Sequence, residues 1–431
     1  MTLPVLILLV GFIVLLMMDV PVAFSIGIST TLAFLAMDDV PAFLLVAHRM
    51  ATAIDGFALL AIPFFILSGQ IMERGGIARK LVDAAEVLVG RLPGGLAIVN
   101  VMTCMLFGSI SGSAAAAVSS IGGFMVPAMN EKGYDRGFNG ALTTCAATTG
   151  LLIPPSNIMI IYAMATGGKV SIAAVFMAGI VPGVLVGLAL MIVAGVLSGV
   201  RGYGRGAAET KEGGLKRLLG AIPALFLVVL VLGGILGGVF TATEASAIAV
   251  LYSLLLTVVI ERSLSLRELP QLFLQAGLTT GVVMLLIASS MAMSWLLAYE
   301  RVPAQLASAL LSISDNPIIV LLVINAMLLA VGTFMDMTPA VLVFTPILLP
   351  VVTDLGMAPT HFGIVLIMNL CMGLCTPPVG TCLFLGCGIA EVPMTRMVRE
   401  LIPFLIAMIA VLLLTTFVPV LSMGLPKALG L

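Results

Sequence analysis

The stretch Gly150-Leu-Leu-Ile-Pro-Pro-Ser156 lies inside the apolar segment 138–165 and decides how that segment can fold. Proline has no backbone N–H and clashes with the preceding turn, so Pro154 and Pro155 break a helix at this point. Inside a membrane, the carbonyl groups that such a break frees must be satisfied by protein, by water or by an ion. We therefore predict a broken transmembrane helix over residues 138–165, with a polar site at its break.

The same pattern occurs a second time. Gly373-Leu-Cys-Thr-Pro-Pro-Val379 follows 223 residues later, inside the apolar segment 359–389. A second pair of landmarks, Gly108-Ser-Ile-Ser-Gly-Ser113 and Gly332-Thr-Phe-Met-Asp-Met-Thr338, is separated by 224 residues. Because both pairs keep nearly the same register, the chain contains an internal repeat with broken helices at matching positions. That arrangement is typical of the midplane site of a secondary transporter.

The composition places the whole chain in lipid. Of 431 residues, 61% are hydrophobic and only 9% are charged, and the mean hydropathy is +1.26. A soluble domain is nearer half apolar and a quarter charged. Long unbroken apolar runs exclude a porin-type barrel, whose strands alternate. A net charge of −1 without a basic patch gives no footprint for nucleic acid. The sequence predicts an all-α polytopic membrane protein.

A membrane-crossing helix needs about 20 residues, and this length predicts the spans. They lie near residues 3–18, 22–37, 57–73, 138–165, 171–200, 218–238, 243–260, 279–298, 359–389 and 401–422. Two further apolar segments, 92–130 and 316–352, are long enough for two passes each and are interrupted by small polar residues. Residues 39–56 and 261–276 are amphipathic and are expected to lie along the membrane interface.

The basic residues predict the orientation. Placing the most basic loop, 201–217, in the cytoplasm puts 15 of the 19 Lys and Arg inside and both termini outside. Both ends of 92–130 are then cytoplasmic and both ends of 316–352 are extracytoplasmic, so each is a re-entrant hairpin opening from its own side. The second half, 218–431, is therefore an inverted copy of the first, 1–200, and 201–217 is a cytoplasmic linker.

Small oxygen-bearing side chains gather at the breaks and the hairpin tips. They are Thr148, Thr149, Ser156, Asn157, Asn369, Thr376 and Thr381 at the breaks, and Ser109, Ser111, Ser113, Thr333, Asp336 and Thr338 at the tips. Neutral hydroxyls, amides and carbonyls suit a hard cation such as sodium, and half-helix N-termini suit a carboxylate. Small residues also occur where membrane helices only pack closely.

Four acidic residues near the apolar segments have different expected roles. Asp336 is either a functional intramembrane acid or a helix cap at the mouth of its hairpin. Glu244 is expected to cap a helix near the outer end of its span. Asp55 and Glu73 flank the span 57–73 and are expected to be solvated or interfacial.

Six motifs in chain order resemble the large membrane subunit of the tripartite ATP-independent periplasmic (TRAP) transporters, the DctM-like family. They are Ala61-Ile-Pro-Phe-Phe-Ile-Leu-Ser-Gly69, Gly108-Ser-Ile-Ser-Gly-Ser-Ala114, Ile153-Pro-Pro-Ser156, Ala178-Gly-Ile-Val-Pro-Gly183, Gly237-Gly-Val-Phe-Thr-Ala-Thr-Glu-Ala245 and Thr376-Pro-Pro-Val-Gly380. One departure is Ala242, where a proline is common in the family. The resemblance implies sodium-coupled uptake of a small organic acid, such as a C4-dicarboxylate, keto acid or sugar acid, by an elevator-type movement.

The resemblance also implies partners and sites. The partners are a four-helix small membrane subunit and a periplasmic substrate-binding protein, in the bacterial inner membrane; sodium ions couple transport, and neither a cofactor nor an enzymatic activity is implied. The first sodium site would use Ser109, Gly150 and Asn157, and the second Gly332, Thr333, Gly373 and Thr376. Substrate would lie between the two tips, near Ser111, Pro155, Asp336 and Pro378.

Two other functions are alternatives to this one. A self-sufficient sodium- or proton-coupled carrier of the inverted-hairpin type would need no binding protein. An intramembrane hydrolase would need a general base, but no histidine lies near these motifs and Asp336 has no second intramembrane acid as a partner.

Overall fold

The computed structural model describes residues 2–37, 41–90, 92, 94–203, 214–314, 316–377 and 379–431, and every regular element in them is helical. The α-helices are α1 (Leu3–Met17), α2 (Val22–Leu35), α3 (Ala42–Ala53), α4 (Ala61–Arg74), α5 (Ile77–Val89), α6 (Gly95–Ser111), α7 (Ala114–Glu131), α8 (Arg136–Thr149), α9 (Asn157–Ala165), α10 (Ile172–Arg201), α11 (Gly214–Leu236), α12 (Ala242–Leu254), α13 (Leu269–Tyr299), α14 (Val302–Ile313), α15 (Pro317–Phe334), α16 (Met337–Asp354), α17 (Pro359–Gly373), α18 (Thr381–Ala390), α19 (Met394–Phe417) and α20 (Val420–Ala428). Three short helical turns, η1 (Phe57–Leu60), η2 (Gly150–Leu152) and η3 (Leu255–Ile260), adjoin α4, α8 and α12.

The expected all-α membrane fold is confirmed. Within the described residues, eight helices are each long and apolar enough to cross a membrane, or nine if the bent pair Arg136–Leu152 and Asn157–Ala165 counts as one span. The two parts of that pair meet at 51°, at the double proline. Exposed leucine, isoleucine, valine and phenylalanine side chains cover the outside, as a lipid-facing surface requires.

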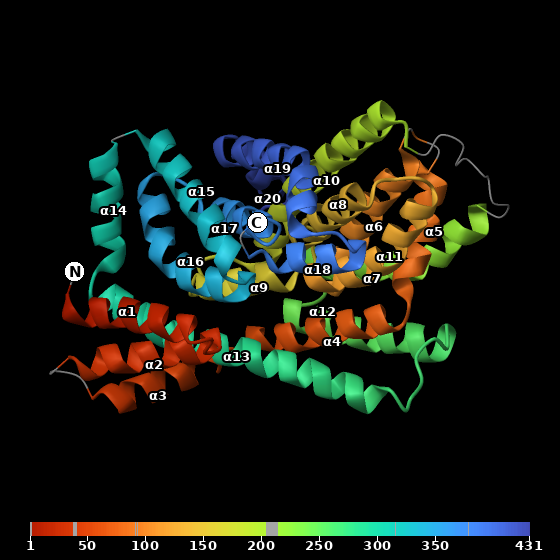
Figure 1. Cartoon of the computed structure of the whole chain (residues 1–431). Helices are drawn as coiled ribbons and strands as arrows, with labels where there is room; N and C mark the ends of the chain where they lie inside the picture. Colours follow the sequence, from red (N-terminus) through yellow and green to blue (C-terminus); the bar gives the residue numbers. More distant parts are fainter. Residues whose placement is uncertain are drawn as a thin grey trace.

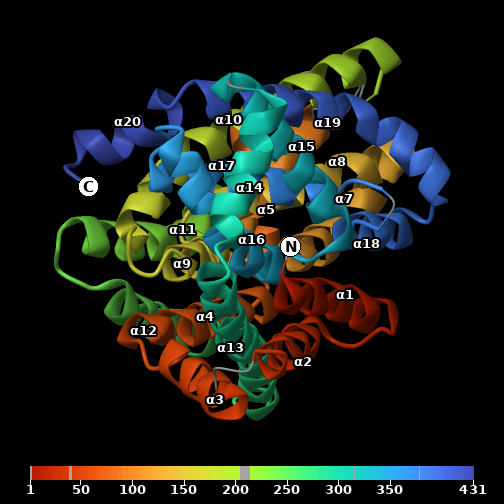
Figure 2. The same ribbon diagram turned by 90° about the vertical axis from the view of Figure 1, so that its left-hand side faces the viewer.

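The helices form two layers (Figure 1). The lower layer consists of α1–α4, α12 and α13, in which α2 packs on α1 and α13, and α4 packs on α12 and α13. The upper layer consists of α6–α10 and α15–α20, and Figure 2 shows the same division after a quarter turn. Helices α5, α11 and α14 contact both layers. The layers meet where α4 packs on α6 and α9, and where α13 packs on α16.

Both hairpins turn within two residues. In the first, α6 ends at Ser111, Gly112 takes a left-handed φ of +64°, and the Ser113 hydroxyl accepts a hydrogen bond from the Ala116 N–H to begin α7. Only glycine adopts such a φ without steric cost. In the second, α15 ends at Phe334, and the extended residues Met335 and Asp336 lead into α16.

Some expected boundaries were wrong. Residues 269–276, expected at the membrane interface, form the first turns of the 31-residue helix α13. The linker expected at 201–217 lies mostly outside the described residues, and its last four residues already belong to α11. Helices α14 and α20 had no counterpart among the expected spans.

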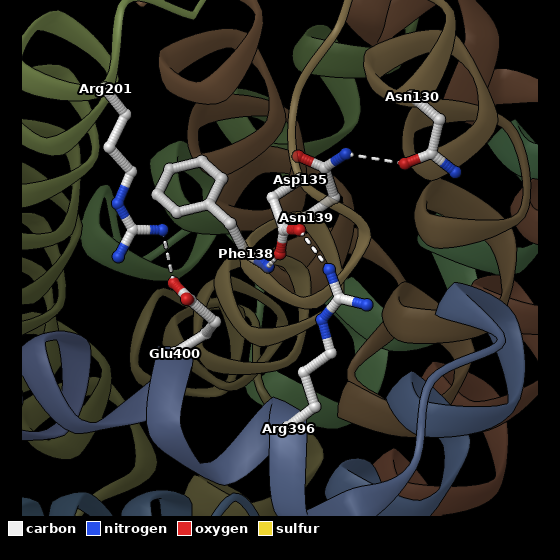
Figure 3. Close-up of polar contacts among 7 residues, drawn as sticks. All are labelled: Asn130, Asp135, Phe138, Asn139, Arg201, Arg396 and Glu400. Carbon is white, nitrogen blue, oxygen red and sulfur yellow. Dashed lines mark hydrogen bonds and ion pairs between the residues drawn. The ribbon is translucent and has the colours of Figure 1, made fainter.

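Five ion pairs connect the basic segments of the chain to acidic residues of other segments. Each pair joins two segments that the basic-residue count places on the same side of the membrane. The pairs are Lys80–Glu261 (2.6 Å), Arg217–Glu86 (3.1 Å), Arg136–Glu391 (3.1 Å), Arg201–Glu400 (2.5 Å) and Arg396–Asp135 (2.5 Å). Figure 3 shows the last two, one on each side of Phe138 at the start of α8.

Two contacts join segments expected on the opposite side. The Thr2 hydroxyl donates to Glu300 over 2.5 Å, and the Arg49 guanidinium lies 5.1 Å from the centre of the Trp295 ring. The relative placement of these ends therefore agrees with the expected topology. Which side is cytoplasmic, and the inverted relation of the two halves, remain predictions.

Candidate substrate and ion site

A cavity of about 530 Å³ lies between the two layers. Its lower wall is formed by α4 and α13, and its upper wall by both hairpin tips and both broken helices. The lining residues are Ile62, Ile66, Gln70, Glu73, Thr279, Val282, Val283 and Leu286 from below, and Ser111–Ala116, Leu151, Asn157, Ile158, Ile161, Asp336–Thr338, Leu374, Thr381 and Cys382 from above. This volume is in the range of small-molecule sites.

Four helices of the upper layer begin at this cavity. Their first residues, Ala114 of α7, Asn157 of α9, Met337 of α16 and Thr381 of α18, all line it. Helices α9, α16 and α18 have no side-chain hydrogen bond at their N-caps. Free N–H groups and the positive end of the helix dipole make such termini favourable for anions. The upper wall is therefore suited to a carboxylate.

The first hairpin tip touches the first break at two glycines. A Cβ atom placed on Gly150 would lie 2.4 Å from the Cα of Gly108 and 3.0 Å from the backbone N of Ser109. No side chain fits at this distance, so glycine is required for the backbones to approach. On the far side of the tip, the Asn157 amide packs against Gly112. The expected residues Ser109, Gly150 and Asn157 thus lie around one junction.

The second tip touches the second break in the same way. A Cβ atom on Gly373 would lie 2.4 Å from the Cα of Gly332. The Gly380 N–H donates to the Thr333 carbonyl across the junction over 3.1 Å. The expected residues Gly332, Thr333, Gly373 and Thr376 therefore lie at or beside a second junction, behind the cavity wall rather than in it.

The hydroxyl groups at both junctions keep oxygen lone pairs available. Ser109 and Thr333 donate to carbonyls of their own helices, at 2.8 and 2.7 Å, and Thr376, just beyond α17, donates to the Met372 carbonyl of α17 at 2.7 Å. A hydroxyl that donates once still has two lone pairs. Backbone carbonyls and hydroxyls are the ligands that hard cations prefer. Among the described residues, no group of three or more His, Cys, Asp or Glu side chains is placed to hold a metal ion.

The four residues expected near substrate have different positions. Ser111 and Asp336 line the cavity from the two hairpin tips. Pro155 is buried in the first break and does not line it, and Pro378 lies outside the described residues. Ser156, next to Pro155, is fully buried, and its hydroxyl has no hydrogen-bond partner among the described residues.

Helix α4 contributes polar residues that the sequence analysis assigned elsewhere. Glu73, expected to be solvated or interfacial, lines the cavity, and its Oε1 accepts a hydrogen bond from the Ser120 hydroxyl of α7 over 3.1 Å. Gln70 also lines the cavity, although the sequence analysis gave it no role. The spacing of Ile62, Ile66, Gln70 and Glu73 places all four on one helix face, and this signal was available in the sequence.

The other two acids behave as expected. Glu244 forms a capping box with Thr241. The Glu244 carboxylate accepts from the Thr241 N–H over 2.8 Å, and the Thr241 hydroxyl accepts from the Glu244 N–H over 3.3 Å. Asp55 is exposed. Neither takes part in the cavity.

A family model described as "Tripartite ATP-independent periplasmic transporter, DctM component" matches residues 9–421. The chain belongs to the DctM family. It is 45% identical over 424 residues to the uncharacterized protein YgiK of Salmonella typhimurium, with 98% of this chain and 97% of the relative covered. It is 37% identical to the C4-dicarboxylate TRAP transporter large permease protein DctM of Pseudomonas aeruginosa, with 94% and 95% covered.

A solved structure has the same fold. The YdaH transporter of Alcanivorax borkumensis superposes with a TM-score of 0.61 over 88% of this chain and 89% of the other, at 12% sequence identity. The DctM-family chain is thus a TRAP transporter large permease, an integral inner-membrane protein and not an enzyme. The hydrolase hypothesis is set aside.

Proposed function

We propose that this DctM-family chain imports a small organic acid with sodium, by an elevator movement of the upper layer against the lower one. The observation that carries the proposal is the position of the cavity. Both hairpin tips and both breaks belong to the upper layer, whereas α4 and α13 supply the opposite wall. A displacement of the upper layer would therefore carry the ion and substrate contacts with it.

Sodium would bind at the two junctions between tip and break. The first ion would use Ser109, Gly150 and Asn157, and the second would use Gly332, Thr333, Gly373 and Thr376. The hydroxyl lone pairs and close backbone contacts described above support this assignment. An ion at either junction would join a hairpin to a broken helix, and so would order the wall that meets the substrate.

The substrate carboxylate would bind at the helix N-termini of the upper wall, near Ser111 and Asp336, with Pro155 and Pro378 fixing the breaks behind it. The Pseudomonas relative is named for C4-dicarboxylates, which carry such groups. Ionised Asp336 would repel a carboxylate, and the two sodium ions would offset that charge.

The cavity would face the cytoplasm in this conformation. It follows α4 to Glu73, next to the basic segment 74–91, and reaches Thr279 in the first turns of α13. The basic-residue count puts both regions near the inner face and both chain termini outside. The chain's two halves, 1–200 and 218–431, would be inverted repeats.

The transporter would act with a four-helix small membrane subunit and a periplasmic substrate-binding protein. The experiment is uptake of a radiolabelled acid into proteoliposomes with each component and sodium omitted in turn. Uptake should need all three proteins and should rise cooperatively with sodium. Robust uptake by this chain alone would favour the self-sufficient carrier, and full-rate uptake without sodium would overturn the coupling.

A further inference from the structure

The lower wall of the cavity has a chemistry opposite to that of the upper wall. The Oε1 atom of Gln70 is buried and has no hydrogen-bond partner among the described residues. One turn further along α4, the Glu73 carboxylate uses Oε1 to accept from Ser120, at 3.1 Å. Both side chains line the cavity. This end of α4 therefore places acceptor side chains at the cavity wall; one acceptor, the Gln70 Oε1, lacks a donor and is covered, so a ligand reaches it only after the amide rotates.

No described basic side chain lines the cavity beside these acceptors. The charged residues lining the cavity are Glu73 and Asp336, and none of the five ion pairs of the described residues involves either of them. A buried acceptor that stays unpaired costs about 1–3 kcal/mol. The Gln70 Nε2 can donate to the carboxylate of any acid, whereas the Gln70 Oε1 and the Glu73 carboxylate only accept. A plain aliphatic acid brings no donor to these oxygen atoms. A ligand that carries a hydroxyl or an ammonium group brings the missing donor.

We propose that Gln70 and Glu73 form a donor-selecting pole, which makes the cavity favour acids that carry a hydroxyl or ammonium group over plain acids of the same carbon frame. The carboxylate would occupy the helix N-termini of the upper wall, and the donor group would bond to α4. This inference rests on the proposed function. It assigns part of the substrate specificity to the membrane subunit itself, in addition to the specificity of a binding protein.

The position of Glu73 gives the pole a second consequence. Its hydrogen bond to Ser120 crosses from the lower to the upper layer. Ser120 uses Oε1 alone, so a donor on the ligand would bond to Oε2 of the same carboxylate. A donor-bearing acid would therefore attach directly to the residue that joins the layers, whereas a plain acid would not.

The test is binding of matched acids to the purified large and small subunits in detergent. Succinate, L-malate and L-aspartate share one frame and differ by hydrogen, hydroxyl and ammonium; hexanoate and gluconate form a second, longer set. Apparent dissociation constants come from the rise in melting temperature with acid concentration, in sodium and in potassium chloride. In sodium, we expect at least one donor-bearing acid to have a dissociation constant about tenfold or more below that of its plain counterpart. A tenfold ratio corresponds to about 1.4 kcal/mol, which is what one added hydrogen bond contributes.

Variants then assign the preference to α4. Gln70→Met and Glu73→Met each remove an acceptor and should bring the ratio of the two dissociation constants toward one. Gln271→Met and Glu86→Met make the same chemical changes outside the cavity and should preserve the ratio. A purely structural role for Gln70 or Glu73 would lower stability without changing the ratio. Glu73→Gln keeps an acceptor and removes the charge, so a larger loss for aspartate than for malate would identify an ammonium ligand, and the reverse a hydroxyl ligand.

The outcomes separate the two proposals. If no acid of either set stabilises the complex in sodium, the proposed function fails and the inference fails with it. If acids stabilise it in sodium but the plain and donor-bearing members bind equally, the function stands and the donor-selecting pole is wrong. A preference that survives both Gln70→Met and Glu73→Met would also overturn it.

Discussion

Replacing Gly150 with alanine should uncouple the first hairpin tip from its broken helix. Gly150 has helical dihedral angles, so alanine causes no backbone strain there. Its new Cβ would instead lie 2.4 Å from the Cα and 2.7 Å from the carbonyl carbon of Gly108. Both are backbone atoms that no side-chain rotation can move. Restoring an ordinary contact of 3.4 Å or more requires the tip and the break to separate by about 1 Å.

That displacement is large for a cation site, where ligand distances vary by only a few tenths of an ångström. Overpacking of this kind costs about 1–3 kcal/mol, which corresponds to about 5–150-fold in an equilibrium constant. We expect Gly150→Ala to raise the half-saturating sodium concentration for uptake by at least fivefold. Gly373→Ala, at the equivalent second junction, should do the same.

The matched control is Gly123→Ala on α7, where a Cβ atom meets nothing within 4 Å. The assay is sodium-dependent uptake into proteoliposomes with all three components, with the melting temperature of the complex recorded alongside. Gly123→Ala should keep the wild-type sodium dependence. A Gly150→Ala transporter that assembles and shows unchanged sodium dependence would refute the junction as an ion site.

Three further changes test other parts of the account. Ser109→Ala and Thr376→Ala each remove one hydroxyl ligand and should weaken sodium binding by about 1–3 kcal/mol. The half-saturating sodium concentration for uptake should rise accordingly, and wild-type uptake curves for both variants would exclude these hydroxyls as ligands. Single cysteines at Thr2 and Ser263, in a background without native cysteines, should react with an impermeant thiol reagent from opposite sides of the membrane, and labelling of both from the periplasm would overturn the topology. Asn369→Leu removes the amide that donates to Asn325 over 2.6 Å in the buried core and should lower the melting temperature without changing the sodium requirement, whereas a changed requirement at normal stability would give this pair a role in ion binding.

The sequence was informative where it constrains the backbone directly. Pro154 and Pro155 cannot continue a helix, so the first break could be placed to within a few residues. Gly108 and Gly332 mark the close approach of the backbone at the tips. The spacing from Thr241 to Glu244 is the sequence pattern of a capping box, which local chemistry alone explains. These features depend on residues near one another in the chain, and such relations can be read without a structure.

It was less informative where long-range packing decides. Glu73 lines the cavity because Ser120, 47 residues away, packs across from it, and the identity of the facing helix is not encoded in α4 alone. The start of α13 was missed because residues 261–276 are amphipathic and too polar to be expected in a span. Pro270 stands in the first turn of the helix, where its absent N–H costs nothing. Polar residues such as Gln271 and Gln275 lowered the hydropathy of those turns, although the helix continues through them.

The movement of one layer against the other is the central claim, and a crosslink between the layers tests it most directly. Cysteines replacing Glu73 and Ser120, whose side chains meet across the layers at 3.1 Å, would be bridged by Hg²⁺ in a background without native cysteines. Cysteines replacing Ser68 and Ser253, which meet at 2.9 Å within the lower layer, provide the control. Each variant is compared with itself after a thiol removes the mercury, so that any effect of losing Glu73 cancels. We predict that the bridge between the layers abolishes sodium-driven uptake reversibly and that the bridge within the lower layer does not. Undiminished uptake with Glu73→Cys and Ser120→Cys fully bridged would contradict the elevator movement.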